Sequence, residues 1–280
     1  MINSLKAALA AGLVILSCAC HGGRKASAVA AAPLVAAEDS TDVPPPEVCA
    51  LMTAYPAFVT GFDGTWLRLA CGDSLLFSSG KELSHDERLA CKDVQSMFYD
   101  IYPLGELTEP PFQSDPGRYR NEDLFKAMYG HSQKEVSANL EKVDVFGSSV
   151  PFTKINGAAD SLRAVIREVG DEHPNLKKYF NEPSSFYWRP VRGADRLSAH
   201  SFGIAIDIGV KYSNYWRWSN PGKEEGDTIK YENKFPAELI HIFERHGFIS
   251  GARWYHFDTM HFEFRPDLIL HSHLQHPPLP

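Results

Sequence analysis

The sequence predicts an α+β fold, in which an antiparallel sheet lines one wall of a cleft and helices pack behind it. A small β-meander with a helix is expected before the main domain. Strand-like and helix-like patterns do not alternate strictly along the chain, which favours an antiparallel sheet over a parallel one. The 280 residues, 44% of them hydrophobic and 22% charged, have the composition of a folded globular protein.

The N-terminus has the pattern of an export signal. Lys6 precedes an apolar run over residues 7–16, which is too short to span a bilayer as a helix. We therefore predict a signal peptide over residues 1–17. The four residues that end at Cys18 resemble a bacterial lipobox, which implies lipidation of Cys18 and a membrane-anchored protein facing the periplasm or cell wall. Cys20 is a second choice for the lipidated residue, and a signal peptide without lipidation is the alternative to a lipoprotein.

The next segments read as a tether and a small N-terminal region. Residues 18–47 are rich in Ala, Ser, Asp and Pro and lack apolar periodicity, so we predict a flexible tether. Residues 48–114 form the N-terminal β/α region. Within it, residues 57–80 alternate apolar and polar positions around turns, as in a β-meander. Residues 84–99 look helical, with Ser84 as the N-cap.

Three cysteines, Cys49, Cys71 and Cys91, lie in this N-terminal region. One disulfide with one free thiol is compatible with an oxidising compartment, and so are three buried thiols. Spacing does not give the pairing.

The main domain is predicted over residues 115–270, after the break at Asp115-Pro116-Gly117. Residues 271–280, which contain three histidines, are expected to be a disordered tail. Strands and loops are predicted over 186–210 and 254–265. Helices are predicted over 121–129, 134–140, 158–169 (closed by Gly170) and 236–246 (closed by Gly247).

A first motif lies between Ser198 and Gly209. From Phe202 onward the segment alternates, so that one face of a strand is apolar and the other is small apart from Asp207. A carboxylate in such a strand is costly to bury unless it is paired or bound to a metal. His200 lies just before the strand and can turn over the same face. The apolar face carries Phe202, Ile204, Ile206 and Ile208.

A second motif lies between Trp254 and Phe264. Its alternation places Phe262 and Phe264 on the core side and His261 with Glu263 on the other. Asp258 comes three residues before His261, at the end of the preceding loop.

Together, the two motifs predict a zinc site. Two histidines and one carboxylate, His200, His261 and Asp207, suit Zn²⁺ with a fourth position open for water. Zinc lowers the pKa of that water to around 7, and a separate carboxylate must accept its proton. Asp258 is the candidate base. Glu263 is expected to orient His261 as an outer-shell residue, and is a rival for the base.

These residues resemble a known family. Ser-x-His-x-x-Gly-x-Ala-x-Asp at 198–207 and Asp-x-x-His-Phe-Glu at 258–263 are similar to the zinc D-Ala-D-Ala carboxypeptidase and L-Ala-D-Glu endopeptidase family. The resemblance implies zinc ligation by His200, Asp207 and His261 and an outer-shell place for Ser198. It also implies that Asp258 is the base, and Asp at this position resembles the endopeptidases.

The resemblance further implies an arginine that holds a substrate carboxylate or carbonyl oxygen. Arg189 best fits that place, and Arg192 and Arg196 are alternatives. The substrates implied are the stem peptides of peptidoglycan. A net charge of −7 gives no basic surplus for nucleic acid. The hypothesis from another class is a catalytically silent zinc-bearing domain that binds cell wall or a protein partner.

Overall fold

The computed structural model describes residues 43–90, 93–191 and 194–276. The predicted signal peptide, Cys18, Cys20, most of the tether, Cys91 and Arg192 lie outside these residues. Where the chain is described, none of its helices is both long and apolar enough to cross a membrane.

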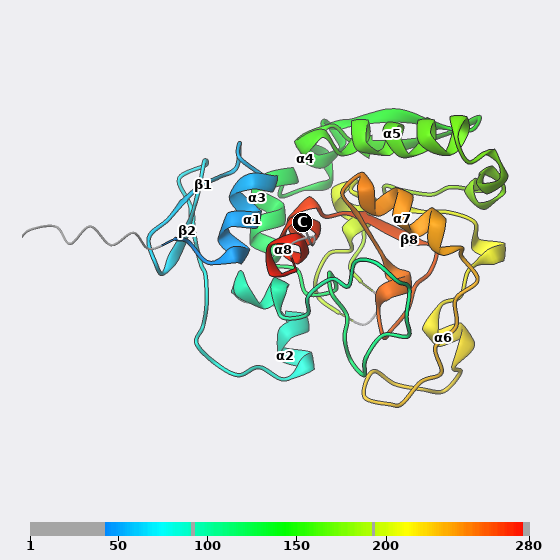
Figure 1. Cartoon of the computed structure of the whole chain (residues 1–280). Helices are drawn as coiled ribbons and strands as arrows, with labels where there is room; N and C mark the ends of the chain where they lie inside the picture. Colours follow the sequence, from blue (N-terminus) through cyan, green and yellow to red (C-terminus); the bar gives the residue numbers. More distant parts are fainter. Residues whose placement is uncertain (1–42, 91–92, 192–193, 277–280) are drawn as a thin grey trace, which may run out of the picture. The chain divides into compact units, whose positions relative to one another are not determined.

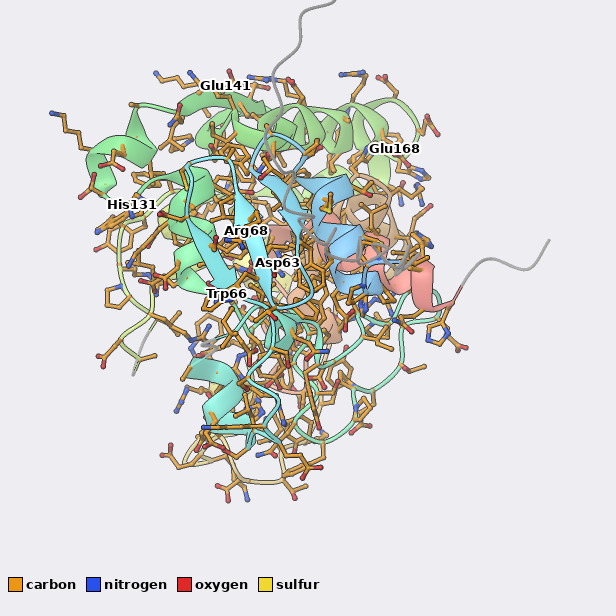
Figure 2. All side chains as sticks on the ribbon, turned by 90° about the vertical axis from the view of Figure 1, so that its left-hand side faces the viewer. Asp63, Trp66, Arg68, His131, Glu141 and Glu168 are labelled. Atoms are coloured by element: carbon orange, nitrogen blue, oxygen red, sulfur yellow. The ribbon has the colours of Figure 1, made fainter. Side chains whose placement is uncertain are left out.

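The described chain begins with a helix and a small sheet. Helix α1 (Pro46–Ala54) starts inside the segment predicted as tether. Strands β1 (Val59–Phe62), β2 (Trp66–Leu69) and β3 (Ser74–Leu76) form an antiparallel sheet in that order. Asp63 holds the β1–β2 turn, because its carboxylate accepts hydrogen bonds from the backbone of Thr65 and Trp66 and pairs with Arg68 (Figure 2).

The predicted helix over 84–99 is two separate elements. Helix α2 (His85–Ala90) follows Ser84, whose hydroxyl and backbone N–H both donate to the Glu87 carboxylate. A 3-10 helix, η1 (Gln95–Phe98), follows. Asp93 precedes it and accepts hydrogen bonds from the backbone N–H groups of Ser96 and Ser79 at 3.0 and 2.8 Å. An aspartate that bonds nearby backbone in this way favours a cap over a continuous helix.

The middle of the chain contains a hairpin that the sequence reading did not predict. Helices α3 (Glu122–Tyr129) and α4 (Gln133–Ser137) are short, and the predicted helix over 134–140 ends at Ser137. Strands β4 (Leu140–Val145) and β5 (Ser148–Thr153) then pair in antiparallel register. Helix α5 (Ala158–Asp171) contacts both strands and continues through Gly170 (Figure 1).

The sheet that carries the two motifs is built from three short strands. Its order is β6 (Ala205–Asp207), β8 (His261–Phe264), β7 (Phe248–Ser250), with antiparallel pairing throughout. Helix α7 (Ala237–Arg245) packs on β7, and Phe243 of that helix stacks on Phe262 with ring centroids 3.8 Å apart. This mixture of helices and small antiparallel sheets agrees with the predicted α+β class.

The last helix differs from the expected disordered tail. Helix α8 (Pro266–Gln275) includes residues 271–275 and lies against α1, from the other end of the chain (Figure 1). The hydroxyl of Tyr55 donates a hydrogen bond to Asp267 at 2.7 Å, and His271 is buried against Phe98. The tail prediction was wrong over 271–275 because these tertiary contacts are not visible in local sequence.

Short helical turns connect these elements. They are η2 (Ile155–Gly157), η3 (Pro174–Phe180), η4 (Ala199–Phe202), η5 (Val210–Tyr212), α6 (Trp216–Ser219) and η6 (Gly251–Arg253).

Candidate metal centre

His200, Asp207 and His261 meet at one edge of the β6–β8 pair. Asp207 is the last residue of β6, His261 is the first of β8, and the register pairs them directly. His200 lies in the turn η4 before β6. His200 Nε2 is 3.2 Å from Asp207 Oδ1 and 3.2 Å from His261 Nδ1, and the distance from His261 Nδ1 to Asp207 Oδ1 is 3.0 Å. Both imidazoles are buried.

The spacing of these three atoms fits a tetrahedral metal. A zinc ion with bonds of about 2.0–2.1 Å holds neighbouring ligand atoms about 3.3 Å apart. The three observed separations of 3.0–3.2 Å therefore match three corners of such a tetrahedron. The donor set of two imidazole nitrogens and one carboxylate oxygen is also one that zinc accepts, with the fourth corner open.

Outer hydrogen bonds fix which ring nitrogen faces the cluster. His200 Nδ1 lies 2.7 Å from the backbone oxygen of Ser185, which can only accept, so this nitrogen carries the proton and Nε2 presents its lone pair. His261 Nε2 lies 3.4 Å from a carboxylate oxygen of Glu263, which leaves Nδ1 for the cluster. Histidine ligands of metals commonly have such outer partners.

Residues next to His200 in sequence stabilise the turn η4 that carries it. Ser198 caps it by accepting the backbone N–H of His200 at 3.4 Å. Gly203 ends the turn with φ +67°, and a Cβ there would lie 2.5 Å from a Leu140 side-chain carbon. Ser201 joins the turn to the segment before it, because its hydroxyl donates to the Arg189 backbone oxygen at 2.8 Å.

Asp258 borders the cluster from the loop before β8. Its backbone N–H donates to Gly251 and its carbonyl accepts from His261, both at 3.0 Å, and it forms a β-bridge with Tyr215. Its Oδ1 atom is buried and has no hydrogen-bond partner within the described chain. Burial, and next the negative charge of Asp207, raise the pKa of Asp258 to about 6. A carboxylate with this pKa can exchange a proton near neutral pH.

Glu263 occupies the far side of His261. It is fully buried, and its Oε2 accepts from Arg120 at 3.1 Å while Arg265 lies 3.6 Å from its Oε1. Burial opposes ionisation, but Arg120 and the hydrogen bond from His261 outweigh it and lower the pKa of Glu263 to about 2. A carboxylate held by two arginines behind the ring suits orientation of His261 better than proton transfer.

The charges in the cluster favour a bound cation. Burial lowers the pKa of His261, but the hydrogen bonds to Asp207 and Glu263 outweigh it and raise that pKa to about 10. Burial raises the pKa of Asp207, but the two histidines outweigh it and hold that pKa well below its usual range. Without a metal, one proton on His261 therefore supplies the positive charge that the site requires.

The cluster opens into a cavity of about 1010 Å³ that includes Asp258 and Arg189 in its lining. Arg189 is exposed, and among the described residues it has no carboxylate partner. Arg196 also lines the cavity and donates to the backbone oxygen of Arg118 at 2.5 Å. Arg192, the third predicted alternative, lies outside the described residues.

A second buried cluster beside the cavity was missed from the sequence. Arg118 donates to Asp115 at 2.7 Å and to Glu225 at 2.9 and 3.0 Å, and His256 Nδ1 lies 2.6 Å from Asp115. His85 Nε2 is 3.8 Å from both carboxylates. The four His, Asp and Glu side chains have a geometry that a metal can use, but Arg118 already supplies a cation to both acids. Glu225 is far from Asp115 in sequence, and the Asp115-Pro116-Gly117 segment indicated a chain break rather than a site.

Comparison with known proteins supports the resemblance of the two motifs. Residues 192–264 match the family model described as D-alanyl-D-alanine carboxypeptidase, a family of zinc-dependent peptidases. The match contains all three residues of the cluster and Asp258, while Arg189 and the Asp115–Arg118 segment lie before it. The search of curated proteins and the search of solved structures found no match.

Proposed function

We propose that this chain, whose residues 192–264 match the D-alanyl-D-alanine carboxypeptidase family model, is a zinc metallopeptidase that hydrolyses peptidoglycan stem peptides. The family match supports a peptidase that acts on cell-wall peptides. One observation carries the proposal of catalysis. Three donor atoms spaced for a tetrahedral metal, on His200, Asp207 and His261, lie beside a carboxylate of raised pKa on Asp258.

Each residue has a distinct task in this proposal. His200, Asp207 and His261 would hold zinc, which would supply Lewis-acid activation of water near neutral pH. Asp258 accepts the proton released by the attacking water and donates it to the leaving amine. Its buried oxygen has no partner in the described chain, which leaves that oxygen free to receive a proton. Glu263 holds the ring of His261 from behind.

Arg189 is proposed to bind the carboxylate or the carbonyl oxygen of the substrate. It lines the cavity, and no acid of the described chain competes for its guanidinium. Charge-assisted hydrogen bonds from such an arginine stabilise an oxyanion as it forms. Arg196, by contrast, is tied to the Arg118 backbone.

Digestion of isolated peptidoglycan tests the proposal. We expect full-length protein with zinc to release new amines and chelator to abolish the release, with mass spectrometry of the muropeptides identifying the bond. The variant Asp258→Ala should lose turnover while zinc stays near one per chain. Binding of peptidoglycan without new amines, with or without metal, would instead support a catalytically silent zinc-bearing domain.

Export and a lipid anchor are proposed from the sequence alone, since the N-terminal residues lie outside the described chain. This localisation is supported by Lys6, by the apolar run over residues 7–16 and by the lipobox-like residues before Cys18. Metabolic labelling with a fatty acid tests it. Label should be lost in Cys18→Ser and retained in Cys20→Ser, and the reverse pattern would move the anchor to Cys20.

A further inference from the structure

An exposed tryptophan borders the cavity that contains the metal centre. The short helix α6 (Trp216–Ser219) carries two tryptophans with opposite environments. Trp216 is 2% exposed, whereas Trp218 is 62% exposed and lines the same cavity as His200 and Asp258. A large aromatic side chain that is open to solvent and lines a cavity offers an apolar surface on which a ligand can stack.

The backbone that presents Trp218 is held on several sides. The N–H of Trp216 donates to the Phe257 backbone oxygen at 2.8 Å, and its ring packs edge-on to His256 with centroids 4.8 Å apart. The backbone N–H of Trp218 donates to the backbone oxygen of Tyr215 at 2.9 Å. The rings of these two residues meet at 81° with centroids 5.4 Å apart. Such a platform loses little entropy when a ligand binds to it.

Arg217 brings hydrogen-bond donors to the same cavity that Trp218 lines. The guanidinium of Arg217 stacks over Trp216 at 4.3 Å, and its ion pairs with Glu224 and Glu225 are long, both at 3.9 Å. Arg217 is about one-third exposed (35%) and lines the same cavity. A cavity lined by both an exposed aromatic ring and guanidinium donors suits a pyranose sugar, which has an apolar C–H face and a polar rim.

The position of Trp218 relative to the base sets where a sugar would lie. Tyr215 forms a β-bridge with Asp258, and paired strands are about 4.8 Å apart. Trp218 is three residues after Tyr215, which adds about 5 Å along the helix axis. The backbone of Trp218 is thus within about 10 Å of that of Asp258. The L-Ala–D-Glu bond is the stem-peptide bond nearest the sugar, whereas the D-Ala–D-Ala bond lies at the far end, roughly 10 Å further along an extended chain.

We propose that Trp218 and Arg217 form a subsite for the amino sugar that carries the stem peptide, so that the enzyme cleaves close to the glycan. This inference rests on the proposed function and narrows its substrate to glycan-linked stems. It favours the L-Ala–D-Glu bond over the terminal D-Ala–D-Ala bond.

A pair of matched substrates tests the subsite. The zinc-loaded, full-length protein is given a disaccharide-linked stem pentapeptide and the free pentapeptide of the same sequence. We expect Trp218→Ala to lower kcat/KM for the glycan-linked substrate roughly tenfold and to leave the free peptide unchanged. Trp66→Ala is the matched control, because Trp66 is also exposed (41%) but lies on β2, outside the cavity lining (Figure 2).

The outcomes separate the subsite from the proposed function. Equal loss on both substrates, or no loss on either, would overturn the sugar subsite. Should the wild-type protein cleave neither substrate, the proposed function fails, and calorimetric binding of the same two ligands still decides the subsite. Weaker binding of the glycan-linked ligand alone in Trp218→Ala would support it, and equal binding by both tryptophan variants would overturn it.

Discussion

Replacing Asp258 with asparagine is expected to stabilise the metal-free protein while it removes activity. The substitution keeps the shape of the side chain and deletes its charge. Burial and the nearby Asp207 make that charge unfavourable in the folded state, which is why the pKa rises from 3.8 to about 6. Active sites often retain such unfavourable groups because function requires them.

The size of the effect follows from the pKa. A shift of about two units corresponds to roughly 3 kcal/mol, at about 1.4 kcal/mol per unit. Part of Asp258 faces the cavity, where water screens the charge, so we expect a gain of about 1–2 kcal/mol. The folded state holds the proton to higher pH than the unfolded state. The loss of folding stability that the Asp258 charge causes is therefore complete above pH 6 and disappears as the pH falls below 3.8.

Urea unfolding with chelator present measures this gain at pH 8 and at pH 4. Asp258→Asn should be the more stable protein at pH 8 and lose most of that advantage at pH 4, while kcat of its zinc form falls by about 10²–10⁴-fold. Asp207→Asn is the contrasting control. The two histidines lower the pKa of Asp207, so its removal should cost stability at pH 8. Lower stability of Asp258→Asn at pH 8, or an equal gain at both pH values, would refute the reasoning.

Three further predictions concern protons and the outer partners of the centre. The pH profile of kcat/KM should have an acid limb at or below about pH 6, where Asp258 takes up its proton. An acid limb above pH 7 would exclude Asp258 as the base. Zinc binding at pH 7 should release at least one proton, because the pKa of His261 is about 10 without metal. Calorimetry in buffers of different ionisation enthalpy measures the number of protons released, and zinc binding without proton release would contradict this prediction. Glu263→Gln should cost about 3–5 kcal/mol of unfolding free energy, because Arg120 and Arg265 lose a buried charged partner. The same variant should bind zinc 10–100-fold more weakly in competition with a chelator, and unchanged affinity would exclude an orienting role.

The meeting of His200, Asp207 and His261 could be anticipated because it depends on local rules. Alternation assigns a face to each residue of a strand, and the small residues around Asp207 left that face open. Pairing of β6 with β8 then places Asp207 opposite His261. The roles of these residues as zinc ligands stay a prediction.

What the sequence did not predict depends on contacts between distant residues. Arg118 meets Glu225, 107 positions away, and no periodicity records that contact. The histidine-rich end is part of helix α8, which packs on α1 and places His271 against Phe98, contacts between residues far apart in sequence. Of the β4–β5 hairpin, only Leu140 fell in a predicted helix (134–140); it lies three residues after the end of α4 and pairs with Thr153, across the hairpin turn.

X-ray absorption at the zinc edge tests the central claim most directly. For the full-length protein loaded with one equivalent of zinc, we expect four ligands, two of them imidazoles, at about 2.0–2.2 Å. His261→Ala should show a single imidazole. A zinc shell without imidazole, or one that His261→Ala leaves unchanged, would contradict the account.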